Sequence, residues 1–324
     1  MAEIMKNTES EKYGATNKSE SGNNIDNTIF IRDAVIEAIQ GIEKHLNSKI
    51  PYIGIPTGFT DFDDLHNGLR KGELIVIASR PLLGKTALVS NISCNIALRM
   101  HKKTDHDKYK VLLFSTFTKR MDVIYRMICS EANISRNDFE RNIMTDKDWV
   151  ALWNSCDNLG SNPYMFINDT PRPSIDEIEN TARILHKQKG LDLLVVDSLQ
   201  FIHPTIKYSN SYDKQLDLTG IASRLKALAC KLDIPVIVTA TVSARCEDRV
   251  NKRPVIADLR DYGKLDEIAD TILFLYKEDF YNPVSEDKHS ELIIAKDRFS
   301  SPDVVNLFFH KDFMKFVGFT KRDL

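Results

Sequence analysis

The chain has 324 residues, of which 42% are hydrophobic and 28% charged, and its net charge at pH 7 is −2. This length fits one large domain or two small ones, with the composition of an ordinary soluble protein. The near-neutral charge argues against a surface that binds duplex DNA all over. A protein that holds one strand in a channel needs only a few cations per subunit, so nucleic acid is not excluded.

The cysteines and the apolar segments indicate the cellular setting. No stretch of about 18 apolar residues is present, so we expect no membrane span. The polar N-terminus lacks the apolar region of a secretory signal. The five cysteines show no zinc-binding spacing, which predicts reduced thiols in a cytoplasmic protein. They are Cys94, Cys129, Cys156, Cys230 and Cys246.

The first fifty residues divide into two segments. Residues 1–28 are rich in Asn, Ser, Glu and Lys and have few large apolar side chains, which predicts a disordered tail. Within residues 29–50, apolar residues recur at helical spacing up to Asn47 and predict an amphipathic helix. Such a helix packs either on its own domain or on a neighbour, and the pattern favours neither. The recurring residues are Ile31, Val35, Ile39, Ile42 and Leu46.

From residue 51 to 324, short apolar runs alternate with helical patterns, which predicts one α/β domain with a mostly parallel sheet flanked by helices. The tail contains strand patterns separated by short turns, so we expect antiparallel strands at the C-terminal end. The expected core strands are 73–78, 110–115, 164–167, 191–196 and 235–240. The expected helices are 86–100, 119–131, 175–187 and 212–231. The expected tail strands are 271–276, 291–296, 304–309 and 315–319.

The sharpest motif lies between an expected strand and an expected helix. It reads Ser79-Arg80-Pro81-Leu82-Leu83-Gly84-Lys85-Thr86. In a P-loop, backbone N–H groups and a helix N-terminus hold phosphates, the Lys reaches the β- and γ-phosphates, and the hydroxyl binds Mg²⁺. Ser79 replaces the usual first Gly, but the Gly-Lys-Thr follows a strand as the motif requires. The sequence therefore predicts a site for a nucleoside triphosphate.

A second motif supports this prediction. Asp197 ends the apolar run Leu193–Val196. A carboxylate at the end of a parallel strand can bind Mg²⁺ through its water shell, as a Walker B Asp does. An isolated Asp at a strand end more often caps a turn. Beside a P-loop, Asp197 and Thr86 are predicted to hold the metal.

Several segments together resemble the RecA-like motor domain of the DnaB-type replicative DNA helicases. The resemblance runs from about Ile53 to Phe316, in the expected order, and includes a P-loop of the form R-P-x-x-G-K-T. Its other parts are the segments 56–63, 68–69, 193–200, 223–229, 234–237, 253–254, 258–260 with Gly263, 269–270 and 295–298. These parts favour the helicases over recombinases and other switch ATPases of the same fold.

The resemblance implies a six-membered ring that acts in DNA replication, binds Mg²⁺ and ATP between subunits and encloses single-stranded DNA. Arg298, with Lys296, would reach the neighbour's γ-phosphate as catalytic groups beside Lys85. Arg260, Asp261 and Gly263 match the family's DNA-contacting loop. The helix before residue 50 would dock on the next subunit. The helical N-terminal domain of the family is expected to be absent, and other replication proteins are expected partners.

Two positions depart from the family. Where the family has a Glu that acts as general base, this chain has Phe117, which cannot accept a proton. Where the family has a Gln that senses the γ-phosphate, this chain has Thr241. General-base catalysis contributes about 10²–10⁴-fold, so hydrolysis is expected to be slow unless another carboxylate, such as Asp122, substitutes.

Two hypotheses follow. The first is an ATP-hydrolysing helicase that moves along single-stranded DNA, and the retained binding groups favour it. The alternative is a hydrolysis-deficient relative that binds nucleotide and acts as an accessory or regulatory subunit. Phe117 and Thr241 favour this alternative.

Overall fold

The computed structural model describes residues 29–46, 52–100, 108–282 and 289–318. The chain divides into two units, residues 1–48 and 49–324. In the first unit, the predicted amphipathic helix forms as α1, Ile31–Leu46. The polar tail predicted for residues 1–28 lies outside the described residues.

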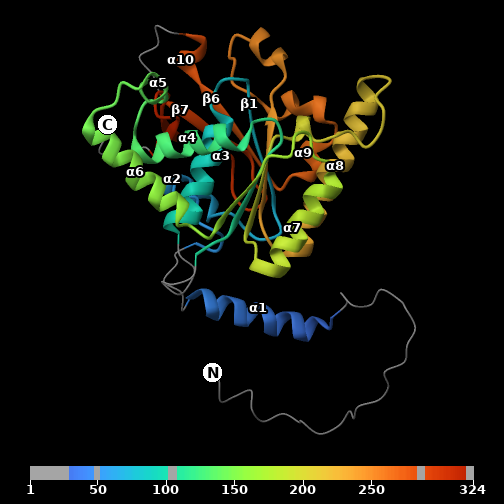
Figure 1. Ribbon diagram of the computed structural model, residues 1–324. Coiled ribbons are helices and arrows are strands. Elements are labelled where there is room, and N and C mark those ends of the chain that lie inside the picture. The colour runs from blue at the N-terminus through green and yellow to red at the C-terminus, as the bar shows by residue number, and fades with distance from the viewer. Residues whose placement is uncertain (1–28, 47–51, 101–107, 283–288, 319–324) are drawn as a thin grey trace. The chain divides into compact units, whose positions relative to one another are not determined.

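The second unit is organised by one sheet of nine strands in the order β3-β2-β4-β5-β1-β6-β7-β8-β9 (Figure 1). Apolar, β-branched runs form the central strands, and β1 is buried along its whole length. The strands are β1 Leu74–Ser79, β2 Val111–Ser115, β3 Met165–Asn168, β4 Leu193–Asp197, β5 Val236–Thr241, β6 Thr271–Lys277, β7 Ser290–Lys296, β8 Asp303–His310 and β9 Lys315–Gly318.

The sheet is parallel from β3 to β6 and antiparallel from β6 to β9. The segment Thr271–Tyr276, predicted as part of the antiparallel extension, pairs antiparallel with β7 as expected but also pairs in parallel with β1, which was not predicted. Residues 242–270 return the chain to the edge where β1 starts before β6 begins. The antiparallel extension therefore consists of β7, β8 and β9.

Helices cover both faces of this sheet. In Figure 1, α7 and α8 lie on one side and α3, α4 and α6 on the other. Alternate residues of β1 point to the two apolar cores: Val76 joins the core with α7 and α8, and Ile77 the core with α3. The α-helices are α2 Thr60–His66, α3 Lys85–Cys94, α4 Arg120–Ala132, α5 Arg136–Arg141, α6 Asp146–Gly160, α7 Ile175–Lys189, α8 Ser211–Leu232, α9 Leu265–Ile268 and α10 Glu278–Tyr281.

Short helical turns connect these elements. The predicted helix 86–100 is α3 followed by one π-helical turn, η1 Asn95–Arg99. The 3₁₀ turns are η2 Leu199–Phe201, η3 Ala244–Asp248 and η4 Ile256–Tyr262. Helix α6 was not predicted, although its capping box of Thr145 and Asp148 is a sequence signal for a helix start. Within the described ranges, no helix has the length and apolarity needed to cross a bilayer.

The carboxyl ends of β2, β4, β5 and β1 meet along one edge of the sheet. The backbone N–H of Thr116 donates to the carbonyl of Asp197 at 2.8 Å, and that of Val242 donates to the carbonyl of Ser79 at 2.9 Å. In open parallel sheets, ligands bind outside this edge. The fold thus gathers the predicted nucleotide residues at one place, which we call the carboxyl edge.

Candidate nucleotide and DNA site

The segment from Ser79 to Thr86 connects β1 directly to the N-terminus of α3. Leu82 and Gly84 both have left-handed backbones, with φ of 70° and 98°. Within the residues that the structure describes, no side chain caps the first turn of α3, so its backbone N–H groups are available to an anion. The turn therefore has the donor set that a polyphosphate requires.

The Lys85 ammonium lies inside this turn. It donates to the Ser79 carbonyl at 3.0 Å and to the Ser79 hydroxyl at 3.1 Å. Burial lowers the pKa of Lys85 to about 8, and the charge of Asp197 opposes part of that shift. The partially buried cation is held by neutral oxygens, so an incoming phosphate would supply a stronger, charged acceptor.

Asp197 lies at the end of β4, beside Ser115 of β2. Its Oδ1 accepts a hydrogen bond from the Thr239 hydroxyl, which fixes the carboxylate orientation. Thr86 is half-buried in the first turn of α3. Among the described residues, no group of three or more His, Cys, Asp or Glu could hold a metal alone. One hydroxyl and one carboxylate fit Mg²⁺, which in phosphate sites keeps waters and phosphate oxygens as its other ligands.

Two aromatic rings support the turn from behind, a feature that the sequence analysis missed. A Cβ on Gly84 would lie 3.0 Å from the Phe316 ring and 3.2 Å from the Phe309 ring. The two rings stack on each other with centroids 4.3 Å apart. Gly84 is thus required both by its positive φ and by this close approach. Only the pairing of β8 with β9 brings the rings to the turn, so no local signal could have revealed them.

The Arg80 guanidinium is bound away from the turn. Its Nε donates to Glu247 at 2.8 Å, and its Nη1 donates to the Val242 carbonyl at 3.0 Å. The predicted role of Arg80 in phosphate binding is therefore restricted to its backbone in this conformation. Its side chain ties the P-loop to the segment after β5.

Phe117 follows β2 at the position of the expected general base. Its side chain is 70% exposed and stacks on Phe201 with ring centroids 4.4 Å apart. The possible substitute, Asp122, forms an ion pair with Arg136 of α5 at 3.4 Å. An aromatic pair thus occupies the place where a carboxylate is expected.

Thr241 ends β5 within a closed group of hydrogen bonds. Its hydroxyl accepts from Gln200 Nε2 at 2.9 Å, and its backbone N–H donates to the Tyr262 hydroxyl at 2.9 Å. The Tyr262 hydroxyl in turn donates to Gln200 Oε1 at 3.2 Å. Neither Gln200 nor Tyr262 was predicted from the sequence as a partner of Thr241.

Lys296 and Arg298 lie at the opposite edge of the sheet from the P-loop. Lys296 pairs with Ile272, near the start of β6, and its ammonium donates to the carbonyls of Asp266 at 2.8 Å and Ala269 at 2.6 Å. The Arg298 side chain is 66% exposed, with one ion pair at 3.6 Å to Asp270. A strand of six residues spans about 20 Å, so neither residue approaches the P-loop of its own chain.

The predicted DNA loop lies at the junction of η4 and α9. Arg260 and Asp261 are exposed there. Gly263 has a φ of 65°, and a Cβ at this position would overlap the Thr219 hydroxyl of α8. The turn is therefore pressed against α8 and presents its two charged side chains to solvent.

Comparison with known proteins identifies the family. The DnaB-like helicase C terminal domain family matches residues 54–318. The chain belongs to this family. The resemblance inferred from the motifs is thereby confirmed over nearly the same range, and so is the RecA-like fold.

The relatives are replicative helicases. The chain is 35% identical over 293 residues to the replicative DNA helicase DnaB of Geobacillus stearothermophilus and to the replicative DNA helicase DnaC of Bacillus subtilis. In each case the match covers 90% of this chain and 62% of the relative. The chain thus spans less than two thirds of the length of these relatives.

Solved structures are similar to this chain as well. One of them, an ATPase domain, superposes with a TM-score of 0.80 and 29% identity, over 90% of this chain and 99% of that domain. A DnaB-like replicative helicase, described with its interactions with primase, superposes with a TM-score of 0.76 and 28% identity. That match covers 93% of this chain and 68% of the helicase.

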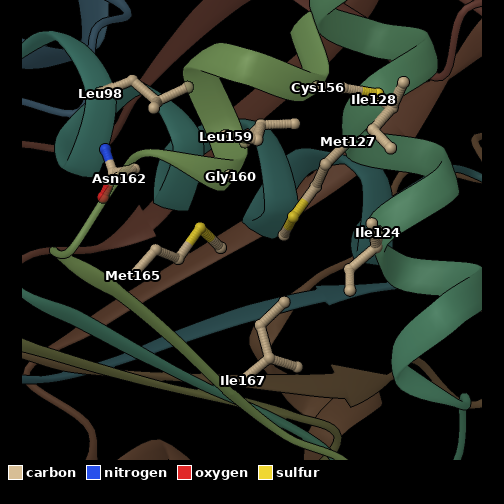
Figure 2. Close-up of a pocket in the computed structure, with 10 residues that line it drawn as sticks. All are labelled: Leu98, Ile124, Met127, Ile128, Cys156, Leu159, Gly160, Asn162, Met165 and Ile167. Carbon is tan, nitrogen blue, oxygen red and sulfur yellow. The ribbon is translucent and has the colours of Figure 1, made fainter.

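This DnaB-like domain also contains an apolar cavity of about 290 Å³ between η1, α4, α6 and β3 (Figure 2). Met127, Met165 and Ile167 line it, with the Cys156 thiol at the α6 side. The Asn162 amide at its rim is already bonded to the Ala97 carbonyl and the Tyr164 N–H. Ligand sites normally offer convergent polar groups, and the polar side chain lining this cavity is committed elsewhere.

Proposed function

We propose that this chain is the motor of a replicative DNA helicase in the cytoplasm. It would bind Mg²⁺ and ATP between the subunits of a ring around single-stranded DNA. The resemblance to the DnaB-type helicases implies that this ring has six members. The observation that carries the proposal is the placement of Lys85, Thr86 and Asp197 at the carboxyl edge of a DnaB-like domain. Its relatives are replicative DNA helicases, and one structural neighbour is described with primase, so other replication proteins are proposed partners.

Within the site, each group has a proposed task. The backbone N–H groups from Leu82 to Thr86 and the Lys85 ammonium would hold the phosphates. The Thr86 hydroxyl and Asp197 would hold Mg²⁺, with Thr239 orienting the carboxylate. ATP supplies the transferable phosphoryl group, whose transfer depends mainly on positioning and charge stabilisation.

The finger residues would act on a neighbouring subunit. Because Arg298 lies at the edge opposite the P-loop of its own chain, it can contribute only to another chain's nucleotide. Its exposed guanidinium fits an arginine finger, which stabilises the charge of the transition state. The Lys296 ammonium is bonded to the end of α9, so in this conformation it supports the strand that carries Arg298.

Single-stranded DNA would contact the loop after η4. Arg260 is exposed and would bind phosphate, and the backbone near Gly263 would contact the sugar-phosphate chain. Asp261 lies beside them. The helix α1 would dock on the next subunit and so help to close the ring.

A second function is favoured by one specific observation, the stacked pair of Phe117 and Phe201. Rings at this position cannot polarise water, and Thr241 is shorter than the glutamine that senses phosphate in the family. A hydrolysis-deficient accessory subunit that binds nucleotide would have this site.

The two functions are separated by ATP turnover with single-stranded DNA in the native protein and the variants Lys85→Ala and Phe117→Glu. Lys231→Ala, at an exposed position of α8, is the matched control. If the native protein turns over ATP, and Lys85→Ala abolishes this turnover while the other variants keep it, the result supports the motor. Turnover that appears only in Phe117→Glu supports the accessory subunit. If the native protein binds no ATP with Mg²⁺ present, both functions are rejected.

A further inference from the structure

A buried tyrosine connects the carboxyl edge to the predicted DNA loop. The Tyr262 ring is 5% exposed. Its hydroxyl accepts from the Thr241 N–H at 2.9 Å and donates to Gln200 Oε1 at 3.2 Å. The Gln200 amide completes the ring of hydrogen bonds through the Thr241 hydroxyl at 2.9 Å. All three polar side chains are therefore satisfied by one another.

The three residues come from three separate elements with distinct tasks. Thr241 ends β5 at the position of the γ-phosphate sensor, and Gln200 lies in η2, three residues after Asp197. Tyr262 ends η4, two residues after Arg260. A displacement of η4 would therefore change the hydrogen bonds of two segments that border the nucleotide site.

Backbone contacts reinforce this connection. Ser79 of the P-loop accepts from the Val242 N–H at 2.9 Å, and the next N–H, of Ser243, donates to the Asp258 carbonyl in η4 at 3.1 Å. The P-loop, the end of β5 and η4 thus form a continuous hydrogen-bonded path. Thr241 directly precedes Val242, the first residue of this path after β5.

The other side of the loop is fixed to α8. The Lys264 N–H donates to the Thr219 hydroxyl at 3.1 Å, and Gly263 packs too closely on Thr219 to admit a Cβ. Arg260 and Asp261 are thus the exposed part of a turn that is anchored on both flanks. Force on the Arg260 side chain would be transmitted to Tyr262 rather than absorbed by a loose loop.

We propose that Tyr262 is a positioning residue that couples the two sites: its hydroxyl holds Thr241 and Gln200 in register with the loop carrying Arg260, so that DNA and nucleotide change each other's affinity. The inference rests on the proposed function, because it requires that both ligands bind. Coupling between sites is reciprocal and typically changes affinities about 5- to 150-fold. One hydrogen bond corresponds to a factor of roughly 2 to 12 in such an equilibrium.

The test measures the dissociation constant of a fluorescent oligo-dT with and without a slowly hydrolysed ATP analogue and Mg²⁺, on the full chain. The ratio of the two constants is the coupling factor. Tyr262→Phe deletes only the hydroxyl, and Gln200→Leu removes its partner from the other side. Tyr276→Phe is the control, since this buried tyrosine also donates to a side chain, Glu278, outside the network.

We expect Tyr262→Phe and Gln200→Leu each to bring the coupling factor about 2- to 12-fold closer to one, with Tyr276→Phe unchanged. Partial unfolding would also alter the ratio, because the ATP analogue stabilises the folded state. Each variant is therefore first shown by circular dichroism to be fully folded without ligand, so that a change in the ratio reports coupling. An unaltered ratio in Tyr262→Phe overturns the inference. If the native protein binds both ligands but shows a ratio of one, the inference also fails while the proposed function stands. Binding of neither ligand rejects the proposed function itself.

Discussion

At the scale of single residues, the site retains its binding groups and departs in the groups expected to activate water. Lys85 and Asp197 have the positions of their motifs, and Thr239 orients the carboxylate. Phe117 instead stacks on Phe201 and cannot act as a base. The two proposed functions therefore make the same prediction for nucleotide affinity and opposite predictions for turnover.

The lowered pKa of Lys85, to about 8, predicts a pH dependence of nucleotide affinity. Above pH 8 the ammonium of the free protein loses its proton, so affinity for Mg²⁺ and an ATP analogue should fall by up to about tenfold per pH unit. Fluorescence titration between pH 7 and 10 measures this. Lys85→Arg should give a flat profile, because a guanidinium stays protonated over this range.

The same pKa shift changes the free energy of unfolding in the opposite direction: it increases with pH while nucleotide affinity falls. Unfolded Lys85 has a pKa of 10.5, so between pH 8 and 10.5 the unfolded chain binds the extra proton. This residue's contribution to the free energy of unfolding therefore increases with pH in that window. A nucleotide affinity that is constant from pH 7 to 10 in the native protein would contradict the assignment of Lys85.

At the scale of elements, the segment between β5 and β6 does the most to join the two candidate sites. It leaves the carboxyl edge through η3, packs on α8 through η4 and α9, and then enters β6 at the opposite edge. Its contact with α8 depends on the absence of a side chain at Gly263, which has a φ of 65°. Helix α8 itself carries Gly220 in its middle, exposed to solvent. Beyond the neighbouring backbone of α8, no heavy atom of the described residues lies within 4 Å of the place that a Cβ would take there.

Replacing each of these two glycines by alanine should change the free energy of unfolding in opposite directions. Gly220→Ala should raise the free energy of unfolding by about 0.5–1 kcal/mol, because glycine in a helix interior loses more backbone entropy on folding. Gly263→Ala should lower it, since a Cβ there meets α8 and the backbone is left-handed. Urea denaturation of both variants measures the two changes. A loss of stability in Gly220→Ala would show that α8 has a steric constraint at that face.

At the scale of the whole molecule, the two edges of the sheet carry the two halves of one expected site. The P-loop lies at the carboxyl edge and Arg298 at the other, separated by the length of β1. A contact of this kind between identical chains joins two different surfaces, and such contacts close into rings or extend into filaments. The geometry of the monomer therefore supports a site completed by a second copy.

Mixing two inactive variants tests this sharing. Lys85→Ala and Arg298→Ala should each lose turnover alone, whereas an equal mixture should regain roughly a quarter of the native rate, because roughly that fraction of interfaces joins an intact P-loop to an intact Arg298. Both variants are made in the Phe117→Glu background if native turnover is below detection. No recovery in assembled mixtures would place both residues outside a shared site.

The sequence by itself determined the fold class, the order of the central elements and the residues of the nucleotide motifs. These depend on local patterns: apolar runs for β1 and β4, and the Gly-Lys-Thr at a helix start. The parallel course of β6 was missed, because periodicity specifies a strand but not the direction of its partner. Helix α6 was missed as well, although the capping box of Thr145 and Asp148 marks its start.

Only the tertiary structure decided which distant residues meet. The Phe309 and Phe316 rings behind Gly84, the Glu247 carboxylate on Arg80 and the ring of Tyr262, Gln200 and Thr241 each join segments far apart in the chain. Such contacts depend on strand register and loop crossing, which no short window of sequence encodes. The chemistry of the site can be read locally, but the partners that hold its groups in place come from the packing of the whole domain.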